Sequence, residues 1–289
     1  MSAPCAELVR EVGVLDESGV QRRLHVPVER PVTIVLDGRE LVTLMTLGAR
    51  VELLVLGYLR NQRIIDQVTE IGSIDVDCTR GRALVARRVE AEPDGAARAG
   101  KARVGEGPGG EPRLVGTACS LGTEFGELMR AVDAASPPPA TSMPPAPLMP
   151  SAAKQRISRS ELLRILEVTR EYDAIHRAAG SVHGCALFQG AEMLVSLEDV
   201  SRHNGLDTVV GWMMSYGVAG SDKTLFTTGR LTGEMVMKAA HNGISIMVSR
   251  NGVTAMGLEL AVKLGLVLFG RAAKGRYLCY SGAERFHDP

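Results

Sequence analysis

The sequence predicts an α/β fold, α+β over the whole chain, in which a β-rich N-terminal domain precedes an α/β domain. Three observations lead to this prediction. Apolar, β-branched runs separated by turn residues fill the first third of the chain, short strands and helices alternate over 182–269, and a proline-rich stretch at 134–153 separates the two patterns. We therefore expect one domain at 1–115, a mobile cysteine loop and linker at 116–153, and a second domain at 154–289.

The N-terminal elements follow from short local patterns. Residues 30–35 and 40–45 flank the turn pair Asp37-Gly38, which predicts a β-hairpin. Residues 51–59 read as a short helix packed on that sheet or as a buried strand. Two further strands are predicted at 73–77 and 83–89. The Gly-, Glu- and Ala-rich residues 92–112 contain almost no large apolar side chain and predict a flexible excursion.

The middle of the chain places Cys119 between two stretches that we expect to be poorly ordered. A short helix is plausible at 124–132, and the proline-dense residues 134–153 favour extended coil because proline lacks a backbone donor. Cys119 is thus predicted to lie on a segment able to move.

The second half begins with a capping box, Ser158-Arg159-Ser160-Glu161, followed by apolar residues at helical spacing. Two β runs then flank the turn Gln189-Gly190. After them the predicted elements alternate, with a glycine beyond each helix as the left-handed stop, which favours a largely parallel sheet covered on both faces. The predicted elements are strands 182–188 and 193–197, helix 203–215, strand 225–228, helix 232–242, strand 244–249, helix 254–264 and strand 266–269.

Composition narrows the classes of function. The 289 residues include 33 Lys+Arg and 33 Asp+Glu, so no overall positive field draws nucleic acid. The first ten residues lack the order of a signal peptide, and no apolar run reaches membrane-spanning length. We expect a cytoplasmic protein that uses neither nucleic acid nor a membrane.

The five cysteines are scattered and odd in number, without zinc spacing or a disulfide framework. Cys185 and Cys279 lie inside apolar β runs, so we expect both to be buried and inert. Cys119, flanked by Gly116 and Gly122, has the exposure and mobility that suit a carrier thiol.

Polar residues follow three predicted strands, where helix N-termini offer free N–H groups to anions. The stretches are 227–230, 249–252 and 270–276, and each contains arginine. One interpretation is ordinary turns between strands and helices; the other is a site for a phosphate-bearing ligand, whose oxygens match guanidinium groups.

The segment 198–204 is the densest polar stretch. Asp199 could cap the next helix, while His203 and Asn204 could face a ligand. His183 reads either as a structural residue or as part of the same site. A zinc deaminase is excluded, because His183-Gly184-Cys185 has cysteine where that class needs glutamate, and no Pro-Cys-x-x-Cys follows.

Four stretches together resemble the formate dehydrogenase accessory sulfurtransferase family, FdhD/NarQ. They are EDVSRHNGLD at 198–207, TGRLTGEM at 228–235 with KAA at 238–240, the run from Ser249-Arg250 to LGL at 264–266, and the helix ending in Gly57-Tyr58-Leu59. The resemblance spans most of residues 26–280.

The resemblance implies a second domain similar to cytidine deaminase in three layers, without zinc. It implies a persulfide loaded onto Cys119 by a cysteine desulfurase and passed to a molybdenum (or tungsten) bis-guanine-dinucleotide cofactor for the catalytic subunit of formate dehydrogenase. GDP would mimic that substrate, and a homodimer is compatible. The implied cofactor-binding residues are His183, Arg202, His203, Asn204, Gly229, Arg230, Ser249, Arg250, Arg271, Ala272, Ala273, Lys274, Gly275 and Arg276.

The chain departs from the family pattern at three places. Gly122 stands where the family has a second loop cysteine, and Thr208 stands where it has a lysine. In the terminal turn, Arg271 stands where the family usually has an aromatic residue, and Ala273 stands where it usually has arginine. Gly122 supports an alternative function, a chaperone that delivers the cofactor without transferring sulfur. A single thiol is nevertheless sufficient for transfer, since the acceptor is the metal.

Overall fold

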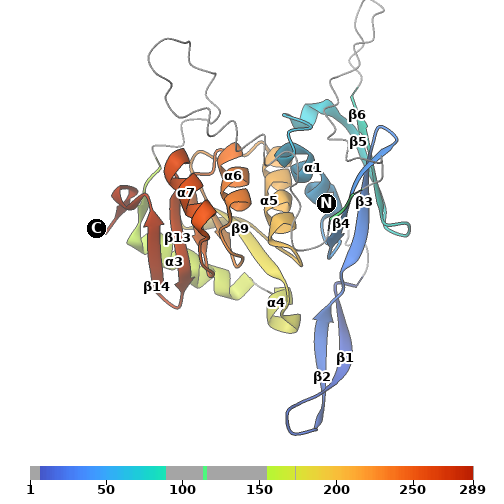
Figure 1. Cartoon of the computed structure of the whole chain (residues 1–289), viewed down its shortest axis with the longest axis horizontal. Helices are drawn as coiled ribbons and strands as arrows, with labels where there is room; N and C mark the ends of the chain where they lie inside the picture. Colours follow the sequence, from blue (N-terminus) through green and yellow to red (C-terminus); the bar gives the residue numbers. More distant parts are fainter. Residues whose placement is uncertain (1–6, 89–112, 116–154, 173, 289) are drawn as a thin grey trace, which may run out of the picture.

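A computed structural model describes residues 7–88, 113–115, 155–172 and 174–288 of the chain. Two sheets, each with its own helices, lie side by side (Figure 1). Cys119, the predicted excursion at 92–112, the helix at 124–132 and the linker at 134–153 lie outside the described residues.

The N-terminal sheet has five strands in the order β5-β6-β3-β4-β7. Asp37 and Gly38 both adopt positive φ, 48° and 81°, so the predicted hairpin is confirmed with the backbone twist that such turns require. Residues 51–61 form a helix rather than a buried strand. The elements are β3 (Arg30–Leu36), β4 (Arg39–Thr46), α1 (Val51–Asn61), η1 (Val68–Glu70), β5 (Ile71–Asp77), β6 (Arg82–Arg87) and β7 (Arg113–Val115).

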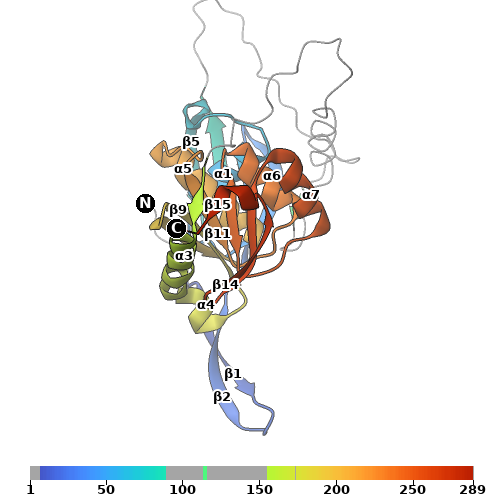
Figure 2. The ribbon, with the colours of Figure 1, turned by 90° about the vertical axis from the view of Figure 1, so that its left-hand side faces the viewer.

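A two-stranded hairpin that the sequence did not predict projects from this part of the molecule (Figures 1 and 2). It consists of β1 (Val9–Leu15) and β2 (Gln21–Pro27). Its turn is stabilised by Asp16, whose Oδ1 accepts hydrogen bonds from the backbone N–H groups of Ser18 and Val20 at 2.9 and 3.0 Å. Most of its residues are exposed, so no buried face marks it in the sequence.

The second part contains a six-stranded sheet in the order β10-β9-β11-β12-β13-β14. The predicted alternation of strands and helices is confirmed, and Gly217 and Gly265 end α5 and α7 in the left-handed conformation. The elements are β8 (Ile157–Ser158), α3 (Arg159–Tyr172), α4 (Ala174–Ala179), β9 (His183–Gln189), β10 (Glu192–Asp199), α5 (Arg202–Tyr216), β11 (Lys223–Thr227), α6 (Gly233–His241), β12 (Ile246–Ser249), α7 (Ala255–Leu264), β13 (Val267–Ala273), β14 (Arg276–Ser281), η2 (Ala283–Arg285) and β15 (Phe286–His287).

The prediction of a largely parallel sheet is wrong, because only two of its five neighbouring strand pairs, β11–β12 and β12–β13, are parallel. The β9–β10 hairpin adds two antiparallel strands on one side, and β14 adds an antiparallel edge on the other. The turn into β14 accounts for this edge, because Lys274 and Gly275 adopt positive φ and reverse the chain after two residues.

Helices cover both faces of this sheet. On β11, Leu225 packs in the cluster formed with α5, α6 and α7, while the next residue, Phe226, packs in the cluster formed with α3. On β12, Met247 likewise packs in the cluster formed with α5, α6 and α7, and Val248 packs in the cluster formed with α3. This period of two places apolar residues on both faces and accounts for the continuous apolar runs in the sequence.

The two parts meet along α1 and α5, which lie beside each other (Figure 1). Glycines allow the close approach, because a Cβ on Gly57 would lie 1.7 Å from the carbonyl oxygen of Asp207. A Cβ on Gly211 would lie 1.9 Å from that of Leu53. The crossing therefore brings the N-terminal part against the helix that carries the polar segment 202–208.

Candidate functional site

Polar residues from several loops gather at the edge of the sheet where β11, β12 and β13 end. Because β9 runs antiparallel to β11, its first residue lies at this edge, and His183 pairs in register with Asp199 at the end of β10. The Thr228 backbone N–H donates to the carbonyl of Gly184 at 2.9 Å. The fold thus brings together segments beginning at His183, Arg202, Gly229 and Arg250, which we call the carboxyl edge.

The turn after β11 is held rigidly by buried hydroxyl groups. Thr227 Oγ1 accepts from the backbone N–H of Gly229 at 3.1 Å, and Ser249 Oγ donates to the Gly229 carbonyl at 2.5 Å. Ser249 Oγ also accepts from the N–H of Asn251 at 2.9 Å. Ser249 is fully buried and therefore shapes the two turns. A Cβ on Gly229 would lie 2.7 Å from Cβ of Arg202, so glycine lets that arginine pack on the turn.

The N-cap of α5 is Ser201, and the suggestion that Asp199 caps this helix is wrong. Ser201 Oγ accepts from the His203 N–H at 3.3 Å. The buried Asp199 carboxylate instead accepts hydrogen bonds from the Thr46 hydroxyl, from the backbone N–H groups of Leu47 and Ser201, and from Asn204 Nδ2. Burial raises the pKa of Asp199 to about 6, against the opposing effect of the hydrogen bonds from Thr46 and Asn204.

Asn204 belongs to the same set of contacts. Its Nδ2 donates to the Met45 carbonyl at 2.7 Å and to Asp199 at 2.9 Å. The bond to Met45 joins α5 to the end of β4, so the Asn204 amide positions the N-terminal part against the carboxyl edge.

His183 and His203 both lie in a positively charged environment. Burial, followed by the charges of Arg202, His176 and Arg230, lowers the pKa of His183. Burial, followed by Lys238, Arg202 and His183, lowers the pKa of His203 to about 2. Both rings are therefore neutral at physiological pH, and the positive charge of this edge comes from the arginines.

A buried polar cluster connects His203 to the interface between the two parts. Lys238 Nζ donates to both oxygens of Asp207, at 2.8 and 3.0 Å, and Asn61 Nδ2 donates to Asp207 Oδ1 at 2.7 Å. Glu234 Oε1 lies 3.5 Å from Lys238 Nζ and 3.2 Å from His203 Nδ1. No role was predicted from the sequence for Asn61, Asp207, Glu234 or Lys238, although Glu234 and Lys238 stand at the i,i+4 spacing of helical ion pairs.

The arginine of the second turn points elsewhere. Arg250 donates to the Thr169 carbonyl at 3.0 Å and lies over the ring of Phe226, 5.5 Å from its centroid, on the α3 side of the sheet. The structure does not bring its guanidinium together with Arg202 and Arg230.

The predicted turn at 271–276 is shorter in the structure. Residues 271–273 belong to β13 and Arg276 begins β14, which leaves Lys274 and Gly275 as the turn. Ala272 is fully buried, whereas Arg271, Ala273, Lys274, Gly275 and Arg276 are exposed. The Arg271 N–H donates to the Asn251 carbonyl at 2.7 Å, which ties the start of this segment to the turn after β12.

Three cysteines lie in the described residues. Cys78 is disulfide-bonded, although the sequence shows no disulfide framework, and the two free cysteines differ in exposure. Cys185 is fully buried, as expected, with Sγ 3.3 Å from Thr227 Oγ1. The expectation that Cys279 is buried is wrong: it is exposed, because it lies on the edge strand β14. Partial burial nevertheless raises the pKa of the Cys279 thiol.

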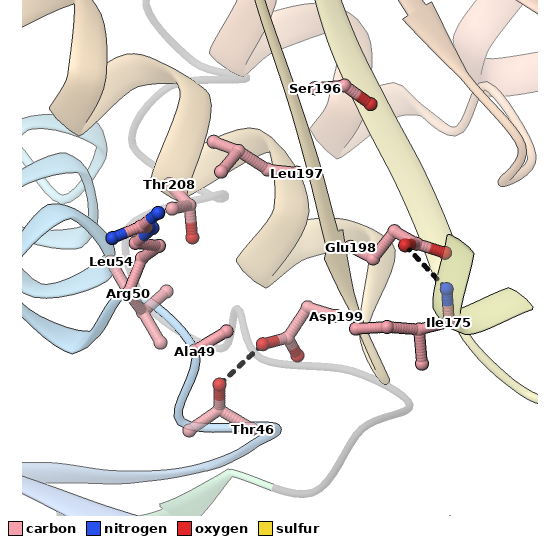
Figure 3. Close-up of a pocket in the computed structure, with 10 residues that line it drawn as sticks. All are labelled: Thr46, Ala49, Arg50, Leu54, Ile175, Ser196, Leu197, Glu198, Asp199 and Thr208. Atoms are coloured by element: carbon pink, nitrogen blue, oxygen red, sulfur yellow. Dashed lines mark hydrogen bonds between the residues drawn. The ribbon is translucent and has the colours of Figure 1, made fainter. Parts of the chain in front are cut away.

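A cavity of about 190 Å³ lies on the outer side of β10, against the N-terminal part (Figure 3). Glu198 on its wall accepts hydrogen bonds from the N–H groups of Ile175 and His176, at 2.9 and 2.8 Å. No local sequence pattern predicts this cavity, since Thr46 and Asp199, which hydrogen-bond across it, are 153 positions apart. Its lining residues are Thr46, Ala49, Arg50, Leu54, Ile175, Ser196, Leu197, Glu198, Asp199 and Thr208.

Two further properties concern only the described part of the chain. There, no three His, Cys, Asp or Glu side chains gather as metal ligands. None of the helices in the same residues combines the length and apolar character needed to cross a bilayer.

Comparisons with known proteins agree over nearly the whole chain. The model of the FdhD/NarQ family matches residues 27–287. A relative from Halalkalibacterium halodurans, named sulfur carrier protein FdhD, is 27% identical, and the alignment covers 100% of this chain and 98% of the relative. The protein of the same name from Bacillus subtilis is 25% identical, with 90% and 89% covered.

The fold is also similar to a solved structure. The crystal structure is named for a formate dehydrogenase accessory protein of Desulfotalea psychrophila, and it has a TM-score of 0.71 and 26% sequence identity. The match covers 96% of this chain and 98% of that chain.

Proposed function

Because the chain belongs to the FdhD/NarQ family, we propose that it is a sulfur carrier that serves formate dehydrogenase. In this proposal Cys119 accepts a persulfide sulfur from a cysteine desulfurase and passes it to a molybdenum bis-guanine-dinucleotide cofactor, which is the substrate. The family match over residues 27–287 carries the proposal, since it includes both Cys119 and the carboxyl edge.

The chemistry of the carboxyl edge fits an anionic, nitrogen-rich substrate. The helices α6 and α7 begin at this edge and offer N–H groups, while Arg202 and Arg230 supply positive charge. A buried polar atom without a hydrogen-bond partner in the described residues also lies here, namely Thr232 Oγ1 at the N-cap of α6. Such atoms are uncommon in folded proteins and support a site that is completed by a ligand.

The transfer needs one thiol. The Cys119 thiolate attacks the outer sulfur of the donor persulfide, the donor's S–S bond breaks, and the desulfurase leaves as a thiolate. In the second step the outer sulfur moves to the metal, which supplies two electrons as it takes up sulfide, and the Cys119 thiolate is released. Gly122 in place of a second cysteine is compatible with this sequence of steps.

The sulfur-loading step is tested with a cysteine desulfurase, cysteine carrying labelled sulfur, and mass spectrometry of the full chain. We expect one labelled sulfur on Cys119 in the wild type and none there in Cys119→Ser. Cys279→Ser is the matched control, because it removes an exposed thiol that the proposal does not use. Absence of label from Cys119 in the wild type would contradict the proposal.

Gly122 also favours a second candidate, a chaperone that delivers the cofactor without transferring sulfur. The two candidates predict different results for one measurement, the formate dehydrogenase activity that Cys119→Ser restores. If Cys119→Ser still restores formate dehydrogenase activity to the wild-type level, delivery alone is sufficient and the chaperone is favoured.

A further inference from the structure

The contact between His203 and Glu234 has the features expected of a carboxylate that orients a ligand-binding imidazole ring. Nδ1 of the imidazole lies 3.2 Å from Oε1 of the carboxylate, and the two side chains are 6% and 14% exposed. Both atoms are enclosed, and neither makes a well-formed hydrogen bond with a described residue. The carboxylate comes from the first turn of α6 and the ring from the first turn of α5.

The electrostatics leave this ring with a single proton. Burial and the positive groups around it, namely Lys238, Arg202 and His183, keep the pKa of His203 near 2. A neutral imidazole has one N–H and one nitrogen lone pair, and the partner of one nitrogen decides which of them carries the proton. A carboxylate beside Nδ1 favours the proton on Nδ1, as in carboxylate–histidine pairs at metal sites.

The other nitrogen, Nε2, is then an acceptor. Nε2 makes no hydrogen bond to a described residue and is not among the fully enclosed atoms, so it is the ring nitrogen open to a ligand. An acceptor nitrogen does not bind a phosphate oxygen, which is itself an acceptor. It binds an N–H group.

We propose that Glu234 is a positioning residue that holds His203 as the Nδ1-protonated tautomer, so that Nε2 accepts a hydrogen bond from an N–H donor of the ligand. This inference rests on the proposed function. It assigns different groups of the ligand to two parts of the proposed site. Arg202, Arg230 and the helix N-termini take the anionic groups of the ligand. His203 takes an amide or amino edge, such as that of a purine or pterin ring.

Lys238 keeps Glu234 in place. Its Nζ lies 3.5 Å from the Glu234 oxygen that faces His203, and it is anchored by two hydrogen bonds to Asp207. Burial, followed by the charge of Asp207, raises the pKa of Glu234, and the positive charge of Lys238 opposes this shift. The ion pair therefore favours the ionised carboxylate that the Nδ1 proton requires.

The tautomer is read directly from the ¹⁵N resonances of imidazole nitrogens in the full chain labelled at histidine, with His203 assigned from the spectrum of His203→Gln. We expect a protonated Nδ1 and a bare Nε2 in the wild type. Glu234→Gln should shift the ring towards the Nε2-protonated form, and Glu234→Asp should restore part of the wild-type population. Glu198→Gln, which alters another carboxylate at the same edge, should leave the His203 signals unchanged.

Folding of each variant is checked by its thermal melt, so that a spectrum from unfolded protein is not misread. An Nε2-protonated ring in the wild type, or an unchanged ring in folded Glu234→Gln, would overturn the inference.

The ligand side is tested with GDP and inorganic pyrophosphate by calorimetry. Glu234→Gln should weaken GDP binding about tenfold, the value of one hydrogen bond. It should leave pyrophosphate binding unchanged, because pyrophosphate has no N–H donor. Equal GDP affinity in the wild type and Glu234→Gln overturns the inference but leaves the proposed function standing. If the wild type does not bind GDP at all, the nucleotide site of the proposed function fails.

Discussion

The replacement of Lys238 by methionine tests the energetic importance of the buried cluster between α1, α5 and α6. Lys238 and Asp207 are 5% and 2% exposed, and the ammonium group donates to both carboxylate oxygens. Although burial alone lowers it, the charges of Asp207 and Glu234 raise the pKa of Lys238, so the pair is ionised. Methionine keeps the unbranched shape and leaves Asp207 as a buried charge that, among the described residues, accepts a side-chain hydrogen bond only from the Asn61 amide.

Breaking a buried pair by removing one partner reduces the free energy of unfolding by about 3–5 kcal/mol. We expect Lys238→Met to show a loss in this range in urea denaturation at pH 7.5. The fluorescence of Trp212, which is the only tryptophan and lies on α5 five residues after Asp207, reports the transition.

The second substitution decides whether charge is the cause. Adding Asp207→Asn to Lys238→Met removes the unpaired charge, so the double variant should be more stable than Lys238→Met by about 1 kcal/mol or more. Lys263→Met on α7, an exposed lysine, is the control and should stay within about 0.5 kcal/mol of the wild type. Additive losses in the double variant would refute the reasoning.

Three further predictions concern pH, packing and ligand binding. The pKa of Asp199 in the folded protein, about 6, lies above its ordinary value of 3.8. Ionisation should therefore lower the free energy of unfolding by about 3 kcal/mol as pH rises from below 3.8 to above 6. Denaturation titrations of Asp199→Asn should lack that fall, and an unchanged pH profile would contradict the shift. Gly211→Ala should destabilise the protein by about 1–3 kcal/mol or more in urea denaturation, since its Cβ would meet the Leu53 carbonyl, whereas Gly13→Ala, with open space around it, should not. GDP at 100 times its Kd should stabilise the protein by about 2.7 kcal/mol and raise Tm; no shift at millimolar GDP would count against the nucleotide site.

Much of the fold follows from local signals in the sequence. The capping box at the start of α3 is real, with the Ser158 N–H donating to Glu161 at 2.7 Å and the Glu161 N–H donating to Ser158 Oγ at 3.2 Å. Gly217, Gly243 and Gly265 all follow helices with positive φ. These features depend on neighbours within a few residues, which is why the sequence predicts them.

The errors arise where contacts are distant in sequence. The apolar residues around Cys279 resemble those of a buried core strand. In the structure, β14 is an edge strand that pairs on one side only, so Cys279 is exposed. Asp199 resembled a helix cap, but its partner Thr46 belongs to the other sheet. The partner of Asp207 in the buried cluster lies 31 residues away on another helix, and only the packing of α5 on α6 brings the two together.

A single-turnover chase follows the proposed passage of sulfur through Cys119 to the cofactor. The protein is first loaded with labelled sulfur and freed of desulfurase, and is then mixed with the molybdenum bis-guanine-dinucleotide cofactor. We predict that label leaves Cys119 and appears in the cofactor in a one-to-one ratio, in Cys279→Ser as in the wild type. Label that stays on Cys119 while the cofactor binds and is delivered to formate dehydrogenase would contradict this proposal.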